Sequence, residues 1–189
     1  MLVLASKSPR RQEILTRAGI DFILRPALID EGLAAGESPG DHVRRLAREK
    51  AEAVAAAPGE ILLGADTVVV AGGQVLGKPA DERQAAWMLR QLSGRQHEVL
   101  TGICFRTLDR LVVDAETTRV RFVELSEAEI AACVASGEPM DKAGAYAIQG
   151  LASKFIDRIE GCYFNVVGLP MALVYRHLQT MTAPPGGKL

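Results

Sequence analysis

The sequence predicts an α/β fold built on a mixed β-sheet. Apolar runs of strand length alternate along the chain with segments that begin at good helix-capping residues. Residues 61–70 are almost continuously apolar, which is typical of a strand buried on both faces. Gly72 and Gly73 then mark a tight turn, which predicts a hairpin in the sheet.

Two strands and two helices are expected before the buried strand. Ser8 is suited to an N-cap and Pro9 to the first helical position, while Gly19 is a common helix stop. Pro58 and Gly59 end the second, longer helix. The expected ranges are strand 2–5, helix 9–18, strand 20–25, a loop rich in glycine and acidic residues at 30–39, and helix 39–57.

The alternation continues to the C-terminal part of the chain. Asp81 caps a helix, a turn near Asp109 joins two long strands, and Ser126 with Glu129 forms a capping box for a helix that Gly137 ends. The expected ranges are helix 81–92, strands 99–107 and 112–125, helix 126–137, loop 138–150, strand 155–159, and a last helix that starts at 168–170. We expect one domain over residues 1–182, with a frayed tail at 183–189 that contains Pro-Pro-Gly-Gly.

Composition limits the classes of function. The formal net charge is -1 and only 5% of residues are aromatic, which argues against a nucleic-acid-binding module. No apolar segment is long enough to span a bilayer, and the first residues lack the charge order of a signal peptide. The three cysteines are widely spaced and suggest neither a disulfide framework nor a zinc site. A reducing, cytoplasmic compartment is therefore expected.

Cations cluster where a helix is expected to begin. Lys7, Arg10 and Arg11 surround Ser6 and Ser8 at a helix N-terminus, where the helix dipole disfavours positive charge. Hydroxyls, free backbone N–H groups and guanidinium groups together form a good phosphate site. The alternative is that the arginine side chains turn into solvent.

Lys50 and Asp66 are charged residues in apolar surroundings. Lys50 falls in the apolar stripe of helix 39–57, where it either reaches the edge of the helix face or points into a cleft to meet phosphate. Asp66 interrupts the strand at 61–70, and a carboxylate there must be paired, hydrogen-bonded or metal-bound. Function is favoured for Asp66 over a structural aspartate bonded to backbone amides, because acidic residues are rarely buried unless engaged.

Two further segments are compatible with a role in ligand binding or with a purely structural role. Residues 72–78 match the spacing of a P-loop, but Pro79 replaces the magnesium-binding hydroxyl, so Lys78 is a point charge for phosphate or an exposed lysine. Residues 141–150 are rich in small residues and either approach a ligand closely or merely connect elements. In that segment Gln149 could read the edge of a base. His97 and His177 lack a partner pattern and are read as structural or surface residues.

Six stretches together resemble the Maf family of nucleotide pyrophosphatases, in the family's order and over almost the whole chain. They are Leu4–Arg11, Leu46–Ala51, Gly64–Val69, Leu76–Pro79, Asp141–Gly150 and Val166–Pro170. The resemblance implies a curved mixed sheet with flanking helices, in two lobes around a cleft, of the kind shared with ITPases. It also implies an enzyme that needs a divalent cation (Mg²⁺, Mn²⁺ or Co²⁺) and releases pyrophosphate from a nucleoside triphosphate.

The resemblance assigns a role to each matching residue. Asp66 matches the general base and Glu31 a conserved acid near the metal, so that Glu31 and perhaps Asp66 would hold the ion. Lys50 and Lys78, with Arg11, would neutralise the triphosphate, and Ser6 and Ser8 belong to the same phosphate-binding segment. The expected partner is a small nucleotide, with no nucleic acid or membrane, and a homodimer is possible.

The form of residues 143–150 resembles the dTTP/UTP branch of the family, with a role in removing unwanted nucleotides from the pool. The specificity positions of that branch match Arg10, Thr67 and Gln149. Ala147 stands where the family usually has glycine, close to Gln149. Two alternatives stay open: a pyrophosphatase for 7-methyl-GTP or another modified purine, and a regulator of septum formation that binds nucleotide without turnover.

Overall fold

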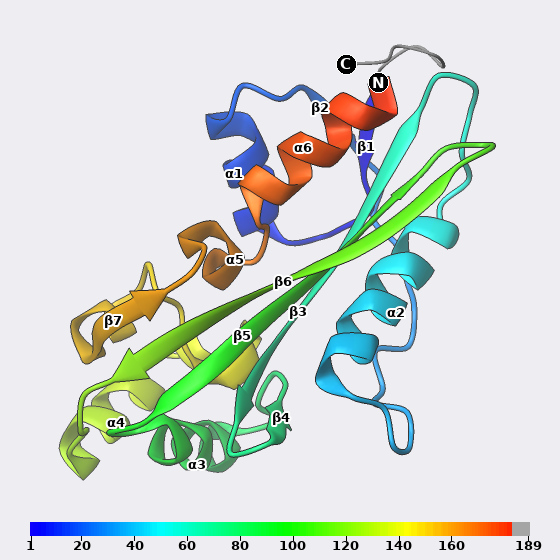
Figure 1. Cartoon of the computed structure of the whole chain (residues 1–189). Helices are drawn as coiled ribbons and strands as arrows, with labels where there is room; N and C mark the ends of the chain where they lie inside the picture. The colour runs from blue at the N-terminus through cyan, green and yellow to red at the C-terminus, as the bar shows by residue number, and fades with distance from the viewer. Residues whose placement is uncertain (183–189) are drawn as a thin grey trace.

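The computed structural model describes residues 1–182 and confirms an α/β fold with a mixed sheet (Figure 1). The strand order is β2-β1-β3-β5-β6-β7, and β4 pairs with β3. Strand β1 is parallel to both of its neighbours, whereas the other pairings are antiparallel. The strands are β1 Leu2–Leu4, β2 Phe22–Leu24, β3 Ile61–Ala71, β4 Gln74–Leu76, β5 Gln96–Arg106, β6 Leu111–Phe122 and β7 Ile156–Glu160. The expected tail at 183–189 lies outside the described residues.

Helices flank the sheet on both sides. In Figure 1, helix α2 lies on one side of the long strands β3, β5 and β6, while α1, α5 and α6 lie on the other, and α3 and α4 pack at the far end of these strands. The helices are α1 Pro9–Arg17, α2 Pro39–Glu52, α3 Glu82–Leu92, α4 Glu127–Ala135, α5 Tyr163–Val167 and α6 Met171–Thr182. Within residues 1–182, no helix has the length and apolar character needed to cross a membrane.

Two strand glycines let α2 approach the sheet unusually closely. A Cβ atom on Gly64 would lie 2.0 Å from the carbonyl oxygen of Ala47, and one on Gly102 would lie 2.1 Å from the carbonyl oxygen of Val43. No side chain can occupy such positions, so glycine is required for this packing. The close approach brings the inner face of α2 against β3 at the level of Asp66, which lies two residues after Gly64 on the same face of the strand.

Most helix boundaries follow the expected capping residues. The Ser8 side chain caps α1, and Ser126 with Glu129 forms the predicted capping box of α4. The predicted end of the second helix at residue 57 is wrong, because α2 ends at Glu52. The guanidinium of Arg106, at the end of β5, donates to the carbonyl oxygens of Ala51, Glu52 and Val54. This contact stabilises the earlier end of the helix from a distant part of the chain.

Other differences lie in the C-terminal third. The short helix α5 is not predicted by the sequence, and the expected loop 138–150 contains the 3₁₀ turns Glu138–Asp141 and Ala143–Ala145. The hairpin after Gly72 and Gly73 is confirmed as β3 and β4. Strands β5 and β6 start earlier than the expected residues 99 and 112, at Gln96 and Leu111.

Candidate active site

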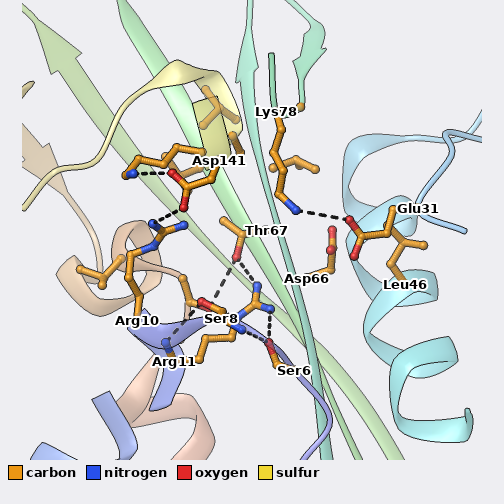
Figure 2. A pocket seen from close by; sticks show the side chains of 18 of the residues that line it. Ser6, Ser8, Arg10, Arg11, Glu31, Leu46, Asp66, Thr67, Lys78 and Asp141 are labelled. Atoms are coloured by element: carbon orange, nitrogen blue, oxygen red, sulfur yellow. Dashed lines mark hydrogen bonds and ion pairs between the residues drawn. The ribbon is translucent and has the colours of Figure 1, made fainter. Parts of the chain in front are cut away.

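One cavity gathers all the side chains that the sequence predicts for the site. It has a volume of about 690 Å³ and lies between the β1–α1 loop, helix α2, strand β3 and the segment at 141–149 (Figure 2). The predicted site residues that line it are Ser6, Ser8, Arg10, Arg11, Glu31, Lys50, Asp66, Thr67, Lys78 and Gln149. Groups from sequence positions far apart therefore converge on one space of a size typical of small-molecule sites.

Lys50 bridges two carboxylates on one wall of the cavity. Its Nζ lies 2.7 Å from Asp66 Oδ1 and 2.5 Å from Glu31 Oε1. Lys50 and Asp66 are 8% and 7% exposed, so each needs the other to offset the loss of solvation. The lysine in the apolar stripe of α2 is thus explained, because it points across the interface between α2 and β3 to Asp66.

Glu31 connects this pair to Lys78. Lys78 Nζ lies 3.7 Å from Glu31 Oε2, and Figure 2 shows both side chains directed toward each other. Partial burial of Glu31 acts to raise its pKa, but the hydrogen bond and charge of Lys50, with the charges of Lys78 and Arg11, outweigh burial and lower it. Glu31 is therefore a carboxylate at neutral pH, and two lysines are within reach of an anion at this wall.

Arg11 is buried and bound to protein acceptors from three segments. Nη1 donates to Ser6 Oγ and the Ala65 carbonyl, Nε to the Gly168 carbonyl, and Nη2 to Thr67 Oγ1. These bonds use four of the five N–H groups of a guanidinium, which leaves one on Nη2 for a ligand. Burial lowers the pKa of Arg11, and the attraction of nearby carboxylates opposes that effect.

The opposite side of the cavity carries Arg10. Its Nη1 lies 3.6 Å from Asp141 Oδ2, and Asp141 also accepts a 2.5 Å bond from Lys142 Nζ. The pair joins α1 to the segment that leads to Gln149 (Figure 2). Ser8 Oγ accepts from the backbone N–H of Arg11, so the residue before helix α1 is held in the capping position. Arg10 therefore stands at the cavity wall with an acidic partner, which an anionic ligand could replace.

The segment that carries Gln149 has a special backbone. Gly144 has φ of 68°, and the following Ala145 has φ of 60° although it is not glycine. A Cβ on Gly144 would lie 2.9 Å from the side chain of Val69, so the segment packs directly on strand β3. The backbone N–H of Gly144 donates to the carbonyl oxygen of Gly77 at 3.1 Å. The strained turn is held by these contacts and fixes the direction in which the chain enters Gln149.

Tyr146, inside the segment at 141–150, and His42 also line the cavity, although the sequence assigns neither of them a role. The Tyr146 hydroxyl lies 2.8 Å from Nε2 of His97, a residue that is 2% exposed. Burial lowers the pKa of His97 to about 4, so its ring is neutral near pH 7. The expectation that His97 is structural agrees with this position. Neither cavity residue has a recognisable partner pattern in the sequence, so only the folded chain identifies them.

The carboxylates fit a divalent cation such as Mg²⁺ or Mn²⁺. These ions prefer oxygen donors, and Mg²⁺ is usually held by one or two carboxylates together with substrate phosphates. Glu31 and Asp66 supply two carboxylates around the same ammonium group of Lys50. Among residues 1–182, no group of three or more His, Cys, Asp and Glu side chains is placed to hold a metal by itself. Phosphate oxygens would therefore have to complete the coordination.

The chain is similar to known proteins over almost its full length. The family described as Maf-like protein matches residues 1–181. The dTTP/UTP pyrophosphatase of Koribacter versatilis is 54% identical over 94% of this chain and 93% of its own length. The dTTP/UTP pyrophosphatase of Symbiobacterium thermophilum is 52% identical over 96% of this chain and 92% of its own length.

A solved structure shares the fold. The Staphylococcus aureus Ham1 protein superimposes with a TM-score of 0.54, covers 96% of this chain and 99% of its own, and is 14% identical in sequence. At that identity the likeness concerns the arrangement of the sheet and helices alone.

Proposed function

This chain belongs to the Maf family, and we propose that it hydrolyses dTTP and UTP to the nucleoside monophosphate and pyrophosphate. Relatives that are more than half identical over nine-tenths of the chain carry the name dTTP/UTP pyrophosphatase. The observation that carries the proposal is the cluster of Asp66, Lys50 and Glu31 in the wall of a cavity that also presents Lys78 and Arg10. The cavity thus combines carboxylates with several cations, as triphosphate hydrolysis requires.

Asp66 is the proposed general base. A water molecule attacks the α-phosphorus, its proton passes to the carboxylate of Asp66, and the bond from the α-phosphorus to the bridging oxygen of the β-phosphate breaks. Pyrophosphate leaves with the electron pair of that bond. Lys50, which is hydrogen-bonded to Asp66, would orient the carboxylate and neutralise charge on the phosphates.

Lys78 and Arg11 would hold the remaining phosphate oxygens. Lys78 is 62% exposed at its side chain and can swing toward a ligand, whereas Arg11 is fixed by its protein partners and offers one N–H. Ser6 and Ser8 hold the start of α1 in place, because Ser6 Oγ accepts from the backbone N–H of Ser8 and Ser8 Oγ accepts from that of Arg11. The phosphate-binding groups therefore include both rigid and mobile donors.

Glu31 and Asp66 would hold a divalent cation, for which Mg²⁺, Mn²⁺ and Co²⁺ are the candidates. When bound, such an ion would neutralise phosphate oxygens and the charge that develops on the departing pyrophosphate. Its capture requires Lys50 to release part of its contact with the two carboxylates. We propose a cytoplasmic site of action, because the nucleotide pool on which such an enzyme acts is there.

Arg10, Thr67 and Gln149 would select the pyrimidine base. The amide of Gln149 offers one acceptor and two donors, which suits the imide edge shared by uracil and thymine. Thr67 Oγ1 is fixed by Arg11 and Thr101, so its position in the wall is well defined. A hydrogen-bonding site rejects bases with the wrong pattern because its own polar groups are then left unpaired.

A nucleotide panel tests this function. Pyrophosphate release is measured for dTTP, UTP, dUTP, CTP, ATP, GTP and 7-methyl-GTP with Mg²⁺, Mn²⁺ or Co²⁺. The proposal predicts the highest kcat/KM for dTTP and UTP. A preference for 7-methyl-GTP would contradict the assigned base selection while keeping the reaction. Tight nucleotide binding by calorimetry, together with no release from any nucleotide, would support a regulatory protein instead.

A further inference from the structure

Glu31 lies in a segment with little support of its own. Residues 25–38 connect β2 to α2 without a strand or a helix. Within the described chain, residues 26–33 take part in no backbone–backbone hydrogen bond. The side chain of Glu31 nevertheless reaches Lys50 at 2.5 Å. Other contacts must therefore place this carboxylate.

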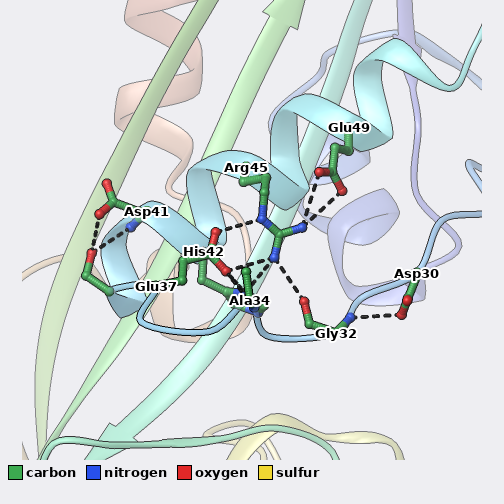
Figure 3. Close-up of polar contacts among 9 residues, drawn as sticks. Asp30, Gly32, Ala34, Glu37, Asp41, His42, Arg45 and Glu49 are labelled. Carbon is green, nitrogen blue, oxygen red and sulfur yellow. Dashed lines mark hydrogen bonds and ion pairs between the residues drawn. The ribbon is translucent and has the colours of Figure 1, made fainter.

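The direct support comes from Arg45 on helix α2. Its Nη2 donates to the carbonyl oxygen of Gly32, the residue after Glu31, at 2.9 Å (Figure 3). The Gly32 N–H donates to Asp30 Oδ1 at 3.0 Å, which fixes the turn on the other side of Glu31. Helix α2 thus holds Glu31 twice, through the side chain by Lys50 and through the adjacent backbone by Arg45.

Arg45 is itself held by Glu37. Nε lies 2.6 Å from Glu37 Oε1 and Nη2 lies 2.8 Å from Glu37 Oε2, a two-point contact that fixes the plane of the guanidinium. The side chain of Glu37 is 10% exposed. The Arg45 hydrogen bond is the main cause that lowers the pKa of Glu37 to about 2. Both groups therefore stay charged and paired at neutral pH.

Glu37 extends the same support to the rest of the segment. Its Oε2 accepts from the backbone N–H of Ala34 at 3.2 Å and lies 3.0 Å from Nδ1 of His42, which lines the cavity. Figure 3 shows these groups gathered at the start of α2. A single Arg–Glu pair thus joins the segment with Glu31, the helix and one wall of the cavity.

We propose that Arg45 and Glu37 form a positioning clamp that sets the place of Glu31 and so tunes the affinity of the site for its divalent cation. The inference rests on the proposed function, since it assigns Glu31 to that cation. Residues behind metal ligands commonly alter metal affinity by about 10- to 100-fold when they are replaced. Neither Arg45 nor Glu37 is among the residues that line the cavity with Gln149, so the clamp should leave base selection unchanged.

The test compares Arg45→Gln with Arg48→Gln. Arg48 lies on the same helix in a similar pair with Glu52 at 2.8 Å, but it is exposed, and among residues 1–182 it forms no hydrogen bond or ion pair with the segment before α2. Arg45→Gln should raise the Mn²⁺ concentration for half-maximal hydrolysis of dTTP by about 10-fold or more, with the dTTP/CTP ratio of kcat/KM unchanged. Arg48→Gln should match the wild-type protein.

Two measurements do not depend on turnover. In the wild-type protein the Gly32 and Ala34 N–H groups donate to the side chains of Asp30 and Glu37. Hydrogen exchange at these two amides should be about 10-fold faster in Arg45→Gln than in the wild-type protein without ligand, while exchange in β3 stays the same. Mn²⁺ binding, followed by electron paramagnetic resonance, should weaken to a similar degree as the activation constant. A folded variant with wild-type exchange at Gly32 and Ala34 and wild-type Mn²⁺ binding would overturn the clamp.

Glu37→Gln keeps the shape of the side chain and is the second test variant if Arg45→Gln does not fold. It should speed the same exchange, and Arg45→Lys should restore little, since lysine lacks the planar two-point contact. Wild-type behaviour of Glu37→Gln would also overturn the clamp. If the wild-type protein hydrolyses no nucleotide, the proposed function fails, whereas the exchange measurement still decides whether the clamp holds the segment.

Discussion

The ammonium group of Lys50 lies 2.7 Å from Oδ1 of Asp66, in a contact that joins helix α2 to strand β3 in the wall of the candidate site. Both residues are almost fully buried, and Lys50 has a second partner in Glu31. The same atoms therefore stabilise the packing of α2 and prepare the proposed chemistry. Replacing a member of this buried pair should therefore change both the free energy of unfolding and the rate of hydrolysis.

Lys50→Met should lose both properties. The change leaves the carboxylate of Asp66 buried without its cation, which we expect to lower the free energy of unfolding by about 3–5 kcal/mol. Pyrophosphate release from dTTP should fall by at least about 100-fold, because a phosphate-neutralising cation is removed. Urea unfolding and the release assay measure the two effects. Lys154→Met, at an exposed position outside the cavity, is the control, and equal behaviour of the two variants would refute the prediction.

Gly102→Ala tests the close packing of α2. The new Cβ would lie 2.1 Å from the carbonyl oxygen of Val43, so the helix must move away from β5. Overpacking of this kind costs about 1–3 kcal/mol or more, and it should also displace Lys50 and reduce turnover. Thermal unfolding followed by circular dichroism gives the stability change. Gly77→Ala, whose Cβ meets no atom within 4 Å, should retain wild-type stability.

Gln149→Leu tests base selection. The amide is removed with little change in volume, so the triphosphate contacts remain while recognition of the base edge is lost. We expect kcat/KM for dTTP to fall by about 10- to 100-fold relative to that for CTP. Gln179→Leu, on the exposed face of α6, is the matched control. An unchanged dTTP/CTP ratio in Gln149→Leu would show that other residues read the base.

His97 predicts a pH dependence of stability. Burial lowers its pKa from 6.5 to about 4, so between these values the unfolded chain binds a proton that the folded chain does not. This contribution to stability is present above pH 6.5 and is lost progressively as the pH falls toward 4. Chemical unfolding at pH 7.5 and pH 5 should show a smaller decrease for His97→Phe than for the wild-type protein. An identical decrease in both proteins would mean that His97 is protonated in the folded state.

Part of this site can be predicted from the sequence, because two of its charged residues stand at positions where an apolar residue is expected. Lys50 in an apolar stripe and Asp66 inside a buried strand are conspicuous, since burial of an unpaired charge is costly. Glu31 gives no such signal in a segment rich in acids, and only the family resemblance indicates it. The lining residues Tyr146 and His42 also have no local pattern, because their contacts depend on how distant elements meet.

The contacts of the arginines are hidden for the same reason. Arg11 looks like a phosphate ligand at a helix start, yet most of its N–H groups bind protein acceptors, including the carbonyl of Gly168 at 157 positions further along the chain. Arg45 is one of several charged residues on the polar face of α2, and nothing in its spacing marks it as the partner of Glu37. Arg106 likewise determines where α2 ends from the far end of β5.

Single-turnover hydrolysis by Asp66→Asn tests the central claim most directly. With enzyme in excess over radiolabelled dTTP, we expect the variant to bind the nucleotide with near wild-type affinity but to release pyrophosphate at least about 100-fold more slowly. Asp109→Asn, in the exposed turn between β5 and β6, should react at the wild-type rate. Undiminished pyrophosphate release by folded Asp66→Asn would contradict the assignment of Asp66 as the base.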